Sequence, residues 1–190
     1  MKPTLTEQDF ADAAGQLGCE VAAIKAVSQV EAPRGGFNPD GTPVTLFEGH
    51  KFHKFTSGAF DGEAPDLSYP TWTRKHYGKN WQAEQTRLQR AMELDREAAL
   101  ESASWGKFQI MGFNYAPAGF GSLQAFINAM YQSEGRQLDA FVSFIQHEGM
   151  AVFLREKRWA DLARRYNGQN YAINKYDTKL AAAYKQFSEA

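Results

Sequence analysis

The sequence predicts a single, mainly α-helical domain with a small irregular or β-hairpin insertion. The chain has 190 residues, enough for one sizeable core, and its 43% hydrophobic and 23% charged composition is that of an ordinary globular domain. Apolar residues recur at helical spacing along most of the chain, with Gly, Asn or Pro between the segments. Residues 37–70 break this pattern, because they are rich in Gly, Pro, Asp and Thr.

The individual helices are predicted from this spacing and from residues that start or stop helices. Thr6 followed by Asp9 matches a capping box, and helical spacing continues from there to Gly18. A second helix is predicted from about residue 20 to residue 31, where Pro33 ends it. The same pattern predicts a helix over 81–100 and a run of short helices over residues 102–115, 122–133, 137–149, 158–168 and 173–187.

Residues 37–70 are predicted to be irregular or to form a small hairpin. The short apolar run VTLFEGH, residues 44–50, fits a strand, and helix is expected only near HKFHKF, residues 50–55. No fixed repeat, heptad pattern or linker divides the chain. We therefore expect one folding unit.

Glu31 lies at the end of an apolar helical stripe. It follows Val27 by four residues and Ile24 by seven, so the three side chains share one helix face. Burial raises the pKa of a carboxyl because the charged form loses water, and the negative end of the helix dipole acts in the same direction. Such a group can serve as a general acid near neutral pH. A glutamate whose stem packs inward while its carboxylate reaches water or Arg34 fits the same spacing.

Glu48 is a second candidate, 17 positions later, in the apolar run PVTLFEGHKF. Glycosidases commonly use two carboxylates, one to protonate the leaving oxygen and one on the opposite face of the sugar. We expect Glu48 to be ionised in a wetter setting than Glu31. A local salt bridge or helix cap beside Phe47 and His50 is the commoner role for a glutamate in such a run.

Other kinds of site find little support in the sequence. His50 and His53 are three residues apart, but no third ligand is spaced to complete a zinc site. The sequence has no nucleophile elbow, phosphate-binding loop or dinucleotide fingerprint. Cys19, the only cysteine, is interpreted as a buried, inert thiol. We expect neither a metal nor a cofactor, which leaves hydrolysis by acid and base carboxylates.

Four blocks of the sequence occur in the order found in one known family. IKAVSQVEAPRGGF (24–37) resembles a helix that ends in a catalytic glutamate, and PVTLFEGHKF (43–52) a block with a second glutamate and a histidine. SASWGKFQIMGFNY (102–115) resembles a stretch that lines a sugar cleft, and RYNGQNYAINKYDTKLAAAY (165–184) a closing block. Together they resemble the phage N-acetylmuramidase endolysins, relatives of goose-type lysozymes and lytic transglycosylases. One departure is Ala32-Pro33, where relatives often have a small hydroxyl residue and Gly.

The resemblance implies a mainly α, lysozyme-like fold in which residues 1–190 form one catalytic domain without a separate wall-binding module. It implies a monomeric peptidoglycan hydrolase that cleaves the β-1,4 bond between N-acetylmuramic acid and N-acetylglucosamine. Glu31 would be the catalytic acid, and Glu48 would position water or stabilise the transition state. The sugar would be held by amide, hydroxyl and ring contacts from Gln109, Tyr115, Tyr166 and Asn167.

Two other functions fit the same residues. A lytic transglycosylase would use Glu31 alone and release 1,6-anhydro products, and a non-catalytic module would bind peptidoglycan without cleaving it. The net charge of −1 gives no reason to expect nucleic acid as a partner. Residues 155–190 hold eight Lys or Arg against four Asp or Glu, so this end could contact an anionic envelope, although a solvated helix face is the commoner explanation.

The N-terminal sequence also predicts where the protein is made. It lacks the continuous apolar run of a secretory signal, and no stretch approaches a membrane span. We expect synthesis in the host cytoplasm and action on the periplasmic wall after release.

Overall fold

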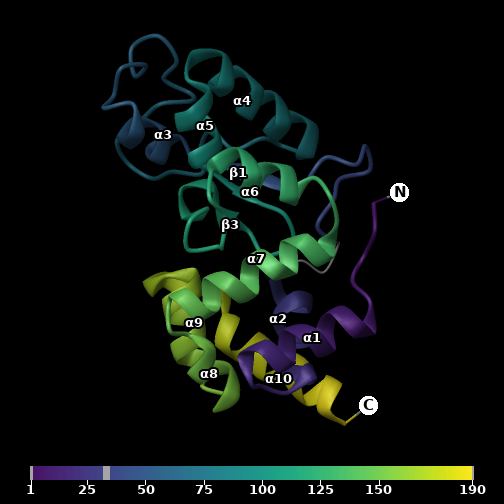
Figure 1. Ribbon diagram of the computed structural model, residues 1–190. Coiled ribbons are helices and arrows are strands. Elements are labelled where there is room, and N and C mark those ends of the chain that lie inside the picture. The colour runs from purple at the N-terminus through teal and green to yellow at the C-terminus, as the bar shows by residue number, and fades with distance from the viewer. Residues whose placement is uncertain (1, 32–34, 190) are drawn as a thin grey trace.

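The computed structural model describes residues 2–31 and 35–189 of the chain. Pro33, which was predicted to end the second helix, and Arg34 lie outside the described residues. Figure 1 shows two groups of helices with α7 crossing between them. We call α3–α6 and the three strands the sheet lobe, and α1, α2 and α8–α10 the helical lobe. The predicted mainly α fold is confirmed.

Both predicted N-terminal helices are present in the helical lobe, as α1 (Glu7–Leu17) and α2 (Val21–Glu31). The capping box forms as expected, because the Thr6 hydroxyl accepts a hydrogen bond from the Asp9 amide and the Asp9 carboxylate accepts one from the Thr6 amide. Gly18 ends α1 with a φ of 64°, a left-handed conformation that favours glycine.

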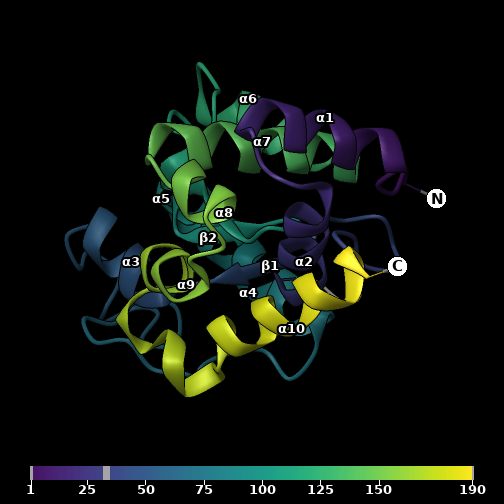
Figure 2. The same cartoon turned by 90° about the horizontal axis from the view of Figure 1, so that it is seen from below.

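Helix α2 lies in the core of the helical lobe. Ile24 is fully buried and Val27 almost so, and burying an aliphatic side chain of this size stabilises the fold by about 1.5–3 kcal/mol. Helix α10 packs along α2, and α1 contacts both α2 and α7. Figure 2 shows this order, with α10 on one side of α2 and α1 and α7 on the other. The packing fixes the C-terminal end of α2, where Glu31 lies.

The second half of the chain supplies α7, which crosses between the lobes, and the remaining helices of the helical lobe. Helix α7 was predicted, as were α9 and α10, whereas α8 was not. Their bounds are α7 (Glu134–His147), α8 (Ala151–Arg155), α9 (Trp159–Asn167), the 3-10 helix η2 (Gln169–Asn174) and α10 (Tyr176–Ser188). The core beneath α7 is aromatic, since the buried rings of Phe108 and Phe141 stack with centroids 4.7 Å apart.

The sheet lobe contains one small antiparallel sheet in the order β1-β2-β3. Its strands are β1 (Thr45–Phe47), β2 (Ala103–Trp105) and β3 (Ile110–Met111). The helix predicted over 102–115 is therefore wrong, because this segment forms β2, β3 and the 3-10 helix η1 (Gly112–Asn114). Gly106 and Gln109 adopt positive φ values of 70° and 50°, which turn the chain between the two strands.

The remaining helices of the sheet lobe are α3 (Gly49–Phe55), α4 (Trp81–Leu94), α5 (Arg96–Glu101) and α6 (Leu123–Met130). The single helix predicted over 81–100 is two helices. Asp95 has an extended backbone, ends α4 and caps α5, where its carboxylate accepts a hydrogen bond from the Ala98 amide at 3.0 Å. Within the described ranges, no helix combines the length and the apolar character needed to cross a lipid bilayer.

Candidate active site

Glu31 is held at the C-terminal end of α2, where it meets the end of α9. The Asn167 side-chain amide donates a hydrogen bond of 3.1 Å to Oε1 of Glu31. Glu31 is partly buried, and its burial raises the pKa of the carboxyl to about 7 even though the bond from Asn167 lowers it. The predicted rise of this pKa is confirmed. At neutral pH, a large fraction of Glu31 carries a proton.

Asn167 also lines a cavity of about 730 Å³ between the two lobes. One wall comes from the irregular segment before α4, and the other from the end of α9 through the start of α10; the lining residues are Trp72, Thr73, Arg74, Asn167, Ile173, Asn174 and Tyr176. Cavities that bind small ligands commonly measure 300–1,000 Å³. Trp72 and Ile173 are 54% and 77% exposed, so apolar surface is available to the face of a sugar ring.

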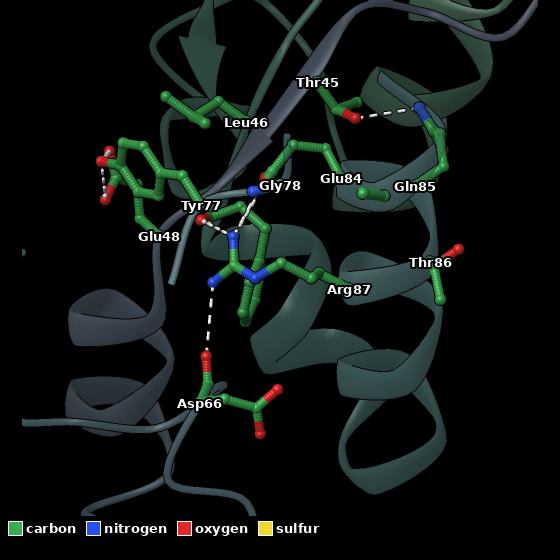
Figure 3. Close-up of polar contacts among 12 residues, drawn as sticks. Thr45, Leu46, Glu48, Asp66, Tyr77, Gly78, Glu84, Gln85, Thr86 and Arg87 are labelled. Carbon is green, nitrogen blue, oxygen red and sulfur yellow. Dashed lines mark hydrogen bonds and ion pairs between the residues drawn. The ribbon is translucent and has the colours of Figure 1, made fainter. Parts of the chain in front are cut away.

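Glu48 immediately precedes α3 and is partly buried. Its side chain is 15% exposed, and the Tyr77 hydroxyl lies 2.8 and 2.9 Å from its two carboxylate oxygens (Figure 3). Burial raises the pKa of Glu48, while the hydrogen bond from Tyr77 and the charge of Arg87 lower it. Glu48 is still less deeply buried than Glu31, as predicted, although the Tyr77 hydroxyl lies against its carboxylate.

His50 lies beside Glu48, as the salt-bridge interpretation required. Its Nδ1 is 3.3 Å from Oε2 of Glu48. Burial and the neighbouring Lys51 lower the pKa of His50, which favours the neutral imidazole at neutral pH. The two side chains are therefore close neighbours, but Nδ1 of His50 makes no hydrogen bond to Glu48 and the neutral imidazole forms no full ion pair with it.

A buried ion pair on α4 fixes the surroundings of Glu48. Nη1 of Arg87 donates to Oε2 of Glu84 at 3.0 Å and to the Phe47 carbonyl at 3.3 Å, and Oε1 of Glu84 accepts from the Gly78 amide at 2.8 Å. The Arg87 guanidinium also lies 5.9 Å from the centre of the Tyr77 ring. As Figure 3 shows, these contacts tie the end of β1 and the segment around Tyr77 to one helix.

Comparison with known proteins is consistent with this geometry. A family model described as N-acetylmuramidase matches residues 20–188. The chain belongs to the N-acetylmuramidase family. The crystal structure of the Burkholderia AP3 phage endolysin is similar to this muramidase with a TM-score of 0.90 and 40% sequence identity, over 98% of this chain and 73% of that one. No significant match was found among curated proteins. The muramidase is a peptidoglycan-hydrolysing glycosidase with the predicted lysozyme-like fold.

The four predicted sugar ligands of this muramidase lie in different parts of the structure. Of these four residues, only Asn167 is among the described residues that line the cavity. Tyr166 lies near Glu31, but its hydroxyl donates to the Phe108 carbonyl and its ring packs against Phe141. Burial and the charge of Glu31 raise the pKa of Tyr166. Tyr166 therefore supports the site from the core side.

Gln109 and Tyr115 have structural partners of their own. Oε1 of Gln109 accepts from the Ser104 hydroxyl at 2.7 Å, and its Nε2 donates to the Gly106 carbonyl at 2.9 Å, which braces the turn between β2 and β3. Tyr115 lines a separate hollow beside α5 and α6. Their predicted contact with sugar stays a prediction.

The other residues singled out in the sequence lie in ordinary structural settings. Nδ1 of His53 lies 2.8 Å from Oδ2 of Asp61, and burial raises the pKa of the half-buried Cys19 thiol to about 11. In the part of the chain that the structure describes, no three His, Cys, Asp or Glu residues cluster as a metal site would require. In the basic C-terminal region, Arg158 and Arg165 form ion pairs with carboxylates, as a solvated helix face does.

Trp72, Arg74, Tyr77 and Tyr176 are site residues that the sequence did not reveal. The first three come from the irregular segment TWTRKHY, residues 71–77, which has no period from which a common face could be inferred. Its density of aromatic and cationic residues was the one available signal. Tyr176 lines the cavity, and burial and the charge of Glu31 raise its pKa.

Proposed function

We propose that this muramidase hydrolyses the β-1,4 bond between N-acetylmuramic acid and N-acetylglucosamine, with Glu31 as the general acid. The observation that carries the proposal is the Glu31 carboxyl, whose pKa is raised to about 7 and which Asn167 connects to a sugar-sized cavity. At neutral pH, an acid with this pKa is about half protonated, and the protonated form can release its proton as the glycosidic bond breaks. Its proton would pass to the glycosidic oxygen, and the C–O bond would break toward an oxocarbenium-like transition state.

Glu48 would be the second carboxylate, acting on the opposite face of the sugar from Glu31. A base or an electrostatic stabiliser must be ionised, and the Tyr77 hydroxyl bonds and the Arg87 charge favour that form. An ionised Glu48 would orient the attacking water or stabilise positive charge on the sugar. This pairing follows the general glycosidase pattern in which two carboxyl groups are given different proton affinities.

A lytic transglycosylase remains the second candidate, because it needs only one acid–base carboxylate. The enclosed and specifically bonded Glu48 supports the hydrolase instead, since a transglycosylase would have no use for a second carboxylate held in this way. We further propose that the muramidase acts on the periplasmic cell wall after release from the host cytoplasm.

Product analysis after digestion of purified peptidoglycan tests the proposal. Hydrolysis gives fragments with N-acetylmuramic acid at a reducing end, and mass spectrometry distinguishes them from 1,6-anhydro fragments. Reducing N-acetylglucosamine ends would show that the other bond is cut. Anhydro products, or unchanged turnover in Glu31→Gln, would contradict the proposal.

A further inference from the structure

Arg74 differs from the other arginines of this protein. Among the described arginines, Arg74 alone donates no hydrogen bond to a protein oxygen and forms no ion pair, whereas Arg90, for example, pairs with Asp66 and Arg158 with Asp161. Its guanidinium instead lies 5.6 Å from the centre of the Trp72 ring, and both residues are exposed. The donors of Arg74 are therefore available to a ligand.

Arg74 is also placed where substrate would lie. It lines the cavity together with Trp72 on one wall and with Asn167 and Tyr176 on the other. Its positive charge lowers the pKa of Tyr176, in opposition to burial and to the charge of Glu31, so Arg74 acts electrostatically across this cavity. A glycan in the cavity could contact Arg74 while a glycosidic oxygen approaches Glu31.

We propose that Arg74 and Trp72 form a subsite for the carboxylate-bearing side arm of N-acetylmuramic acid. This inference rests on the proposed function and names the part of the substrate that the site reads. The ring of Trp72 would pack on the sugar, and the guanidinium fork of Arg74 would take a carboxylate in a bidentate contact. That carboxylate belongs either to the lactyl group or to the stem peptide attached to it.

The subsite would set the register of the glycan strand. The strand alternates two sugars joined by β-1,4 bonds, and only N-acetylmuramic acid carries the lactyl arm. A cation at a fixed position relative to Glu31 therefore favours one of the two registers. In that register, the bond presented to Glu31 is always of the same kind, which is how an acid could discriminate between two chemically similar bonds.

The experiment measures binding in the Glu31→Gln background, so that no ligand is consumed. Three soluble tetrasaccharides of alternating N-acetylglucosamine and N-acetylmuramic acid serve as ligands, with free lactyl carboxylates, with the same groups converted to neutral amides, or with stem peptides attached. Calorimetry gives Kd for each. A second variant adds Arg74→Ala, and a third adds Arg136→Ala as the control, because Arg136 is an exposed arginine that pairs with Asp139 on α7.

We expect Arg74→Ala to weaken binding of a carboxylate-bearing ligand about tenfold and to leave the amide unchanged, as for loss of one charge-assisted contact. Arg136→Ala should change none of the affinities, which controls for overall charge. Dependence on Arg74 with the free lactyl ligand assigns the carboxylate to the lactyl group, and dependence with the peptide-bearing ligand alone assigns it to the peptide. Trp72→Ala should weaken all three ligands equally.

Equal losses for the acid and the amide, or no loss for any ligand, would overturn the subsite. The subsite would also be overturned if Glu31→Gln bound none of the three tetrasaccharides measurably while the wild-type enzyme cleaved peptidoglycan. Failure of the proposed function has a different signature, since it would be seen in the products and in the turnover of Glu31→Gln, which do not depend on these affinities.

Discussion

Glu31 and Glu48 are both withdrawn from water, yet their surroundings differ. Glu31 receives one hydrogen bond, from a neutral amide, and burial raises its pKa to about 7. Glu48 is approached on both oxygens by the Tyr77 hydroxyl and feels the charge of Arg87, which work against its burial. Burial alone therefore does not assign roles to two carboxylates. The groups that remain in contact with each one decide which keeps its proton.

The largest expected effect follows from removing the proton donor. Glu31→Gln should lower kcat on purified peptidoglycan about a thousandfold, since general acid catalysis commonly contributes 10²–10⁴. Glu63→Gln, which alters an exposed glutamate, should keep wild-type turnover. Circular dichroism would verify that the fold is retained. Turnover of Glu31→Gln within a few fold of wild type would remove Glu31 from its role.

Glu48→Gln should have a smaller but still large effect. We expect kcat to fall about a hundredfold, because a second carboxylate that orients water or stabilises charge supplies only part of the barrier reduction. The pH profile sharpens the comparison. Wild-type kcat should fall at high pH as Glu31 loses its proton near 7 and fall at low pH as Glu48 gains one. In Glu48→Gln, kcat should no longer fall at low pH. If it still falls, the group that titrates there is not Glu48.

The burial of Glu31 should also be measurable as a cost in stability. Its pKa is raised in the folded state, so the wild-type protein loses free energy of unfolding as pH rises from the ordinary 4.5 to about 7. Glu31→Gln carries no such penalty and should gain about 2–3 kcal/mol over wild type between pH 4 and pH 8. This corresponds to a rise in Tm of about 5–10 °C at pH 8. If the difference in Tm between Glu31→Gln and wild type were the same at pH 4 and pH 8, Glu31 would be hydrated in the folded protein.

Tyr77→Phe should give the smallest change and affect Glu48 alone. Loss of the hydroxyl raises the pKa of Glu48, so the acidic limb of the kcat profile should move to higher pH, with kcat about threefold to tenfold lower at neutral pH. Tyr184→Phe is the matched control, because that hydroxyl donates to the exposed Glu20. An unmoved acidic limb in Tyr77→Phe would mean that the hydroxyl does not tune Glu48.

The two carboxylates also show how far the sequence alone could go. The position of Glu31 was predictable because helical register follows from local spacing, and α2 keeps that register to its last residue. The groups that act on Glu48 could not be predicted in this way. Tyr77 and Arg87 lie 29 and 39 residues further along the chain, and only the tertiary fold brings them to Glu48. Strands β2 and β3 are three and two residues long, too short for an alternating pattern to be recognised.

Of the four predicted sugar ligands, only Asn167 is among the described residues that line the cavity, and the reason is related. Amide and hydroxyl side chains bind whichever partner the fold brings within reach, and for Gln109 and Tyr166 those partners are backbone carbonyls or a neighbouring serine. Trp72 and Arg74 were missed because an irregular segment carries no periodic signal for the direction of its side chains. Residue type alone could not distinguish side chains with partners inside the protein from side chains that line the cavity.

The most direct test is a titration of the Glu31 carboxyl in the folded enzyme, followed by ¹³C NMR on selectively labelled glutamate and assigned with Glu31→Gln. We predict a pKa of about 7 for Glu31. A pKa near the ordinary 4.5 would mean that Glu31 is ionised at neutral pH and would contradict its role as the proton donor.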